Sequence, residues 1–112
     1  MAYKYFIDRV VGGYQFALYP NNNNECSIVK SCAYPTVAAC REALEEFRLV
    51  VSRIKTLGEN SIEIKGNGSS VTFTVNKDGK CLATSHGYGG ISLCKDGARR
   101  LLNHYSDPLK NR

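Results

Sequence analysis

A chain of 112 residues, 43% of them hydrophobic and 22% charged, has the size and composition of one folded domain, which argues against a disordered or multidomain protein. The net charge of +5 favours encounters with anions, but the basic residues are scattered from Lys4 to Arg112 and form no block. No apolar run approaches the ~20 residues of a membrane span, and the first residues lack the apolar stretch of a signal peptide. We therefore expect a cytoplasmic protein.

The first part of the chain has the patterns of short strands. Apolar and polar residues alternate there, and aromatic or β-branched residues are frequent. Gly12-Gly13 breaks the pattern once, and Pro20 with four asparagines predicts a turn at the second break. Strands are predicted at residues 3–10, 14–19 and 26–33.

A long helix is predicted after the third strand. Thr36 follows Pro35 and is a suitable N-cap, and Gly58 ends the helix as the residue after its last turn. Apolar residues recur at spacings of three and four, which places them on one buried stripe. The stripe consists of Val37, Cys40, Leu44, Phe47, Val51 and Ile54.

The second half repeats this order. Strands are predicted at residues 61–65 and 71–75, and Asp78-Gly79 is a hairpin signal. Phe73 stands 57 positions after Phe16, and beyond the shorter second turn the offset is 54. At that offset a second apolar stripe matches the first, and its members are Ile91, Cys94, Ala98, Leu101 and Tyr105. Asp107-Pro108 ends this second helix.

We interpret residues 1–112 as one domain made of two tandem repeats, about residues 3–57 and 59–107. Each repeat carries Ser-x-x-Tyr before its helix, and each alone could bury only one face. The predicted fold class is α+β: two β-β-β-α units form a single antiparallel sheet of about six strands, with both helices packed on one face. The other face of the sheet is expected to be wholly or partly exposed.

The stretch Asp78-Gly79-Lys80, followed by Ser85 to Gly97, resembles the YegP-like family of small bacterial proteins. The resemblance implies a single antiparallel sheet with helices packed on it, and an exchange of end strands between the two units. Residues 59–65 would then be the exchanged strand. The first half departs from the pattern at Ala43, which stands where the second half has Gly97. The family has no established activity, so the resemblance implies no site residues.

Residue types of a hydrolytic triad are present in the second half. Ser85 and His86 are adjacent, and Asp96 and Asp107 follow. The Gly-x-Ser-x-Gly turn that would present a nucleophile is absent, however, and a triad depends on geometry rather than on inventory. We therefore expect no enzyme, no catalytic residues and no cofactor.

The five cysteines form no C-x-x-C pair and no zinc-finger spacing, which argues against a metal site. We interpret them as reduced, partly buried thiols. Cys40 and Cys94 occupy equivalent stripe positions, and a regulatory disulfide between them would need Cα atoms within about 7 Å.

Two candidate binding sites remain. Gly87, Tyr88, Gly89 and Gly90 precede a helix N-terminus, where free N–H groups can hold an anion, although a tight strand-to-helix turn explains the glycines equally well. The second is a nucleic-acid surface, provided that the strands bearing its lysines are neighbours. Those lysines are Lys4, Lys30, Lys65 and Lys80.

The function that we expect is a non-enzymatic protein-interaction module, which binds a protein partner or a second copy of itself through the exposed sheet face or a sheet edge. The alternative is a weak nucleic-acid or anion-binding protein that uses its positive charge. Salt separates the two, because binding to nucleic acid weakens steeply as the salt concentration rises.

Overall fold

The computed structural model describes residues 3–20, 27–57, 62–68, 70–77 and 79–110. The asparagine turn, Gly58 and Asp78 lie outside these residues. The elements, in chain order, are β1 (Lys4–Val10), β2 (Gly13–Tyr19), β3 (Val29–Ser31), α1 (Val37–Leu57), β4 (Glu63–Asn67), β5 (Ser70–Lys77), β6 (Lys80–Ser85) and α2 (Ile91–His104).

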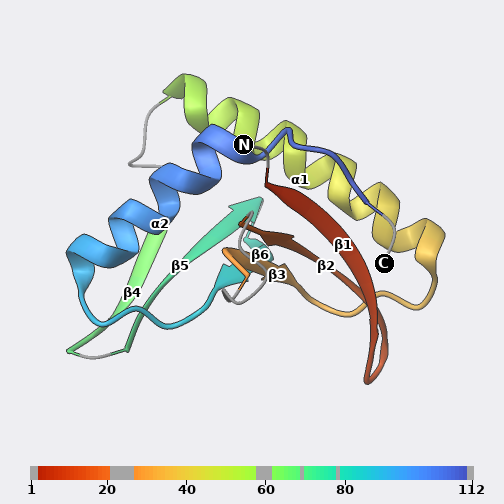
Figure 1. Ribbon diagram of the computed structural model, residues 1–112, viewed down its shortest axis with the longest axis horizontal. Helices are drawn as coiled ribbons and strands as arrows, with labels where there is room; N and C mark the ends of the chain where they lie inside the picture. The colour runs from red at the N-terminus through yellow and green to blue at the C-terminus, as the bar shows by residue number, and fades with distance from the viewer. Residues whose placement is uncertain (1–2, 21–26, 58–61, 69, 78, 111–112) are drawn as a thin grey trace.

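The six strands form one antiparallel sheet in the order β1-β2-β3-β6-β5-β4, and both helices lie over the same face of it (Figure 1). The predicted α+β fold is therefore confirmed. Among the described residues, neither helix combines the length and the apolar character that a membrane span requires.

The two halves of the chain meet at the centre of the sheet. There β3 pairs with β6, and Lys30 stands opposite Thr84. Each end strand stays in its own half, because β1 pairs with β2 and β4 pairs with β5. The exchange that the resemblance implied for residues 59–65 is therefore wrong for the described part of that segment. The reason is local: a short turn after Asn67 returns the chain directly to Ser70, which favours pairing of neighbouring strands.

The serine of each Ser-x-x-Tyr motif makes the same two hydrogen bonds. Ser31 Oγ accepts from the Phe16 amide at 3.0 Å and donates to the Cys32 carbonyl at 2.8 Å. Ser85 Oγ accepts from the Phe73 amide at 3.0 Å and donates to the carbonyl of the next residue at 2.8 Å. These hydroxyls satisfy buried backbone groups where the strand ladder stops. That the two halves arose by duplication remains a prediction.

The core lies between the sheet and the helices. Phe16 and Phe47 pack with their ring centroids 5.2 Å apart, and most of the predicted helix stripes are buried against this cluster. The stripe prediction is wrong at its first members, because Val37 is 37% exposed and Ile91 is 54% exposed. Both residues begin their helices, and a helical Cα–Cβ bond tilts toward the N-terminus, so these side chains point past the end of the helix.

A β-bulge interrupts the pairing of β5 with β6. Val75 stands opposite Ala83, but Asn76 stands opposite Cys81, so Leu82 is an extra residue. The bulge changes the alternation of side chains along β6. Leu82 and Ala83 are both buried, whereas Cys81 is exposed.

Candidate functional site

The face of the sheet opposite the helices is not covered by any described element (Figure 1). We call it the open face. Residues that pair across antiparallel strands point to the same side, so the register assigns its members. They include Lys4, Phe6, Asp8, Gln15, Tyr19, Lys30, Glu63, Lys65, Thr74 and Thr84.

The register brings three of the four lysines proposed for nucleic-acid binding to this face. Lys4, Lys30 and Lys65 all point away from the helices. Lys80 does not, because it pairs with Lys77, whose Nζ lies 3.4 Å from a carboxylate oxygen of Glu46 on α1. Lys80 therefore projects on the helix side of the sheet.

Acidic and aromatic side chains separate these lysines. Lys65 Nζ lies 3.0 Å from a carboxylate oxygen of Glu63, and Lys4 Nζ lies 5.8 Å from the ring centroid of Phe6. Asp8 lies on the same face, within 3.5 Å of the Tyr19 hydroxyl. The open face thus carries mixed charges rather than the continuous basic surface that nucleic acids select.

The glycine-rich turn before α2 offers fewer anion-binding groups than its sequence indicated. The backbone N–H of Tyr88 donates to the Val71 carbonyl at 2.8 Å, and its carbonyl accepts from the Val71 amide at 3.0 Å. Gly87 and Gly89 are exposed, and Gly90 precedes α2 without a side-chain capping bond. The Tyr88 amide is consequently engaged in the sheet.

The Tyr88 side chain has a structural role that the sequence pattern did not predict. Its ring is buried beneath α2, and its burial raises the pKa of the hydroxyl. A Cβ atom at Gly97 would overlap that hydroxyl, so any larger residue there requires the Tyr88 side chain to shift. In the first half, Ala43 carries a methyl group at the equivalent position, and Tyr34 is only half-buried. The sequence shows that Gly97 and Ala43 differ, but it does not show that Tyr88 packs against Gly97.

The triad residues are not arranged for catalysis. The hydrogen bonds of Ser85 Oγ go to backbone groups, as described above. His86 Nδ1 lies 2.9 Å from the Ser27 carbonyl oxygen. Asp107 is near a different histidine, with its Oδ2 2.8 Å from His104 Nδ1. Within the described ranges, no cluster of three His, Cys, Asp or Glu residues could hold a metal ion.

One edge of the sheet, β1, is paired with the chain itself at Tyr5. The segment Asp107–Lys110, which we call the C-terminal strap, runs beside β1 in parallel. The Tyr5 amide donates to the Pro108 carbonyl and the Lys110 amide donates to the Tyr5 carbonyl, both at 2.9 Å. Arg48 of α1 donates to the Asp107 carbonyl at 2.8 Å.

The other edge is β4, and its free backbone groups can be assigned from the register. Gly66 stands opposite Val71, whose N–H and C=O both bond to Tyr88 on the far side. Ile64 stands opposite Phe73, whose N–H also points away from β4. In an antiparallel ladder, Ile64 and Gly66 must then direct their own N–H and C=O groups outward. No residue that the structure describes pairs with this edge.

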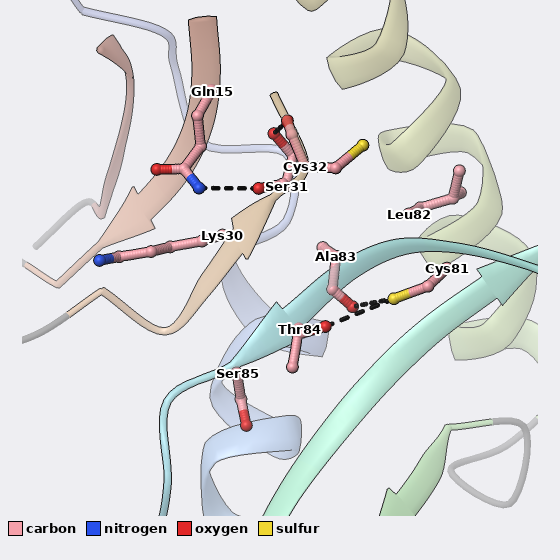
Figure 2. A pocket seen from close by; sticks show the side chains of 9 residues that line it. All are labelled: Gln15, Lys30, Ser31, Cys32, Cys81, Leu82, Ala83, Thr84 and Ser85. Carbon is pink, nitrogen blue, oxygen red and sulfur yellow. Dashed lines mark hydrogen bonds between the residues drawn. The ribbon is translucent and has the colours of Figure 1, made fainter. Parts of the chain in front are cut away.

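A pocket of about 380 Å³ lies at the centre of the sheet, where the two halves meet. We call it the seam pocket. Figure 2 shows its lining, with the Cys32 and Cys81 side chains on different sides. The lining residues are Gln15, Lys30, Ser31, Cys32, Cys81, Leu82, Ala83, Thr84 and Ser85. No sequence pattern indicates that these two distant cysteines share one pocket, because the β3–β6 pairing that unites them is a long-range contact.

No protein-family model matches the sequence, and no curated protein matches it. Similar solved structures include the solution NMR structure of YegP from E. coli, a protein of unknown function, with a TM-score of 0.74 and 16% identity over 100% of this chain and 94% of YegP. A UPF0339 protein from Shewanella oneidensis has a TM-score of 0.74 and 15% identity, over 99% of this chain and 92% of its own. The chain therefore has the YegP-like fold. At these identities the likeness establishes the fold and not an activity.

Proposed function

We propose that the protein is a non-enzymatic protein-interaction module, and that it binds an extended segment of a partner protein along the outer edge of β4. The observation that carries this proposal is the difference between the two sheet edges. The C-terminal strap hydrogen-bonds to Tyr5 of β1, whereas the outward backbone groups of Ile64 and Gly66 on β4 have no partner among the described residues.

An unpaired strand edge is a template for another strand, and soluble proteins usually protect such edges. Here β4 is only five residues long and carries Glu63 and Lys65 on the open face. These charges disfavour indiscriminate pairing, and they still allow a strand with complementary charges to add. The main-chain hydrogen bonds of an added strand supply affinity, and its alternate side chains supply specificity.

Ile64 gives the site an apolar contact. Its side chain is partly buried and packs against the core, on the face opposite Lys65. A partner strand would therefore place apolar side chains beside Ile64 and charged ones beside Glu63 and Lys65. The alternative of nucleic-acid binding has less support, because Asp8 and Glu63 interrupt the lysines of the open face.

Proline substitution on the two edges tests this proposal. Ile64→Pro removes an outward N–H of β4 without removing a hydrogen bond to β5. Ile7→Pro is the matched control on β1, because Ile7 stands opposite Phe16 as Ile64 stands opposite Phe73. We expect the wild-type chain to select extended peptides from a random peptide library. Binding of those peptides should be lost in Ile64→Pro, kept in Ile7→Pro and changed little by salt.

The contrary results are equally clear. If no peptide is selected, or if Ile64→Pro binds the selected peptides as well as the wild type does, β4 is not a docking edge. If instead oligonucleotides bind at low salt and are released as salt rises, the nucleic-acid alternative replaces the proposal.

A further inference from the structure

We propose that the seam pocket is a site of thiol–disulfide exchange with small anionic disulfides, at which Cys81 makes the first attack and Cys32 resolves the mixed disulfide. This inference is independent of strand binding at β4. The four thiols of the described residues fall into two pairs. Cys32 and Cys81 are free, exposed and share one pocket, whereas Cys40 and Cys94 are free and fully buried.

The pocket exists because the central ladder is short. β3 ends at Ser31, opposite Ala83, while β6 begins earlier, at Lys80. The residues that precede Ala83 therefore have no pairing partner on β3. This leaves room beside Cys81 for the body of a small molecule.

Cys81 is placed to act as the nucleophile. The β-bulge at Leu82 turns Cys81 to the side of Thr84, and its Sγ lies 3.3 Å from the Thr84 hydroxyl oxygen. Lys30 pairs with Thr84, so its ammonium group projects from the same face. The Cys81 Sγ also lies 3.6 Å from the Ala83 carbonyl oxygen. Lys30 lines the pocket, and its positive charge attracts an anionic reactant.

Cys32 lies across the pocket, as Figure 2 shows. The two sulfur atoms point in different directions in the structure, and the Cys32 thiol lies beside the Tyr34 hydroxyl. Resolution therefore requires that both exposed side chains turn toward each other, with their Cα atoms within about 7 Å. Because Cys32 follows directly after the Ser31–Ala83 pair, it stands beside the segment that contains Cys81. Covalent attachment at Cys81 would break the contact between its sulfur and the Thr84 hydroxyl, so the Cys81 side chain could then rotate toward Cys32.

A small disulfide is the oxidant in this exchange. The Cys81 thiolate attacks one sulfur of the small disulfide, which forms a mixed disulfide and releases one thiolate. The Cys32 thiolate then attacks the Cys81 sulfur, forms the Cys32–Cys81 bond and releases the second thiolate. The two protons that the cysteines lose end on the two released thiols. The protein dithiol is oxidised by two electrons, and the small disulfide is reduced.

The buried cysteines supply an internal comparison. Burial raises the pKa of the Cys40 thiol and of the Cys94 thiol, and both side chains are inaccessible. Since the thiolate is the reactive species, these two residues should not take part in the exchange.

The test is incubation of the folded full chain with oxidised glutathione, followed by intact mass and peptide mapping. Cys26→Ser serves as the background, because Cys26 lies outside the described residues. We expect a Cys32–Cys81 disulfide with no glutathione retained. In that background, Cys32→Ser should trap one glutathione on Cys81. Cys81→Ser should abolish the rapid phase of the reaction with oxidised glutathione. Cys94→Ser is the control and should change neither the product nor the rate.

Charge gives a second readout that a merely accessible thiol would not show. Lys30→Gln should slow the reaction with oxidised glutathione severalfold and leave the reaction with neutral 2-hydroxyethyl disulfide unchanged. The proposal is overturned if glutathione stays on Cys81 while Cys32 is intact, if Cys40 or Cys94 reacts at the same rate, or if Lys30→Gln slows both reagents equally.

Discussion

Gly97 and Tyr88 show how one residue pair distinguishes two otherwise similar halves. The tyrosine ring occupies the space that a side chain at Gly97 would fill, and its hydroxyl is buried without a hydrogen-bond partner among the described residues. In the first half Ala43 carries a methyl group at the equivalent position, and Tyr34 is more exposed. The difference is therefore a packing difference beneath the two helices.

This contact predicts that Gly97→Ala destabilises the protein. Alanine normally favours a helix by ~1 kcal/mol over glycine, but the clash with Tyr88 should outweigh that gain and give a net loss of about 1–3 kcal/mol in the free energy of unfolding. Ala43→Gly is the matched control, and it should lose only the ~1 kcal/mol of helix propensity. Urea unfolding measures both. A Gly97→Ala protein more stable than the wild type would mean that Tyr88 moves freely.

At the scale of elements, the C-terminal strap is held by side chains as well as by its backbone. Asp107 Oδ2 accepts from the Tyr3 amide at 2.7 Å and lies 2.8 Å from His104 Nδ1. The Tyr3 ring stacks on His104 with centroids 3.7 Å apart. One carboxylate thus connects the residue before β1, the end of α2 and the strap.

We expect Asp107→Ala to loosen the strap more than the rest of the fold. The loss of these partly buried, charge-assisted bonds should cost about 1–3 kcal/mol and should speed amide exchange at Lys110 and Tyr5, whose N–H groups bond across the strap. The control is Asp96→Ala on the outer surface of α2, which should leave both amides unchanged. Equal protection of Lys110 in the wild type and in Asp107→Ala would show that the backbone alone holds the strap.

Local patterns predicted the elements well, and long-range contacts were the limit. Alternation and helical spacing gave the order of strands and helices, because these patterns reflect burial along one element. The resemblance suggested exchanged end strands, which the β4–β5 hairpin does not support. Neither the seam pocket nor the strap left a pattern in the sequence, since each joins segments from opposite halves of the chain. The separation of Lys80 from the other lysines depends on a bulge that single-sequence reasoning did not detect.

At the scale of the whole molecule, burial of titratable groups links stability to alkaline pH. Desolvation raises the pKa of Tyr5, of Tyr34 and of Tyr88 above the ordinary value of 10.0, and it raises the pKa of two thiols above their ordinary 9.0. These groups keep their protons longer in the folded chain than in the unfolded chain. The contribution of the thiols is therefore complete below about pH 8, that of the tyrosines is complete below about pH 9, and both are lost as pH rises further.

The free energy of unfolding should accordingly begin to fall near about pH 8 and should fall more steeply above about pH 10, as urea unfolding at fixed ionic strength would measure. Tyr5→Phe separates this titration from simple packing. It removes the hydrogen bond from the Tyr5 hydroxyl to the Tyr105 carbonyl, 2.7 Å long, and so lowers stability at neutral pH by about 1 kcal/mol. It also removes one buried phenol, so the decline with pH should be shallower than in the wild type. Parallel declines in the two proteins would show that Tyr5 ionises as readily in the folded chain as in the unfolded chain, and that the core does not exclude its charge.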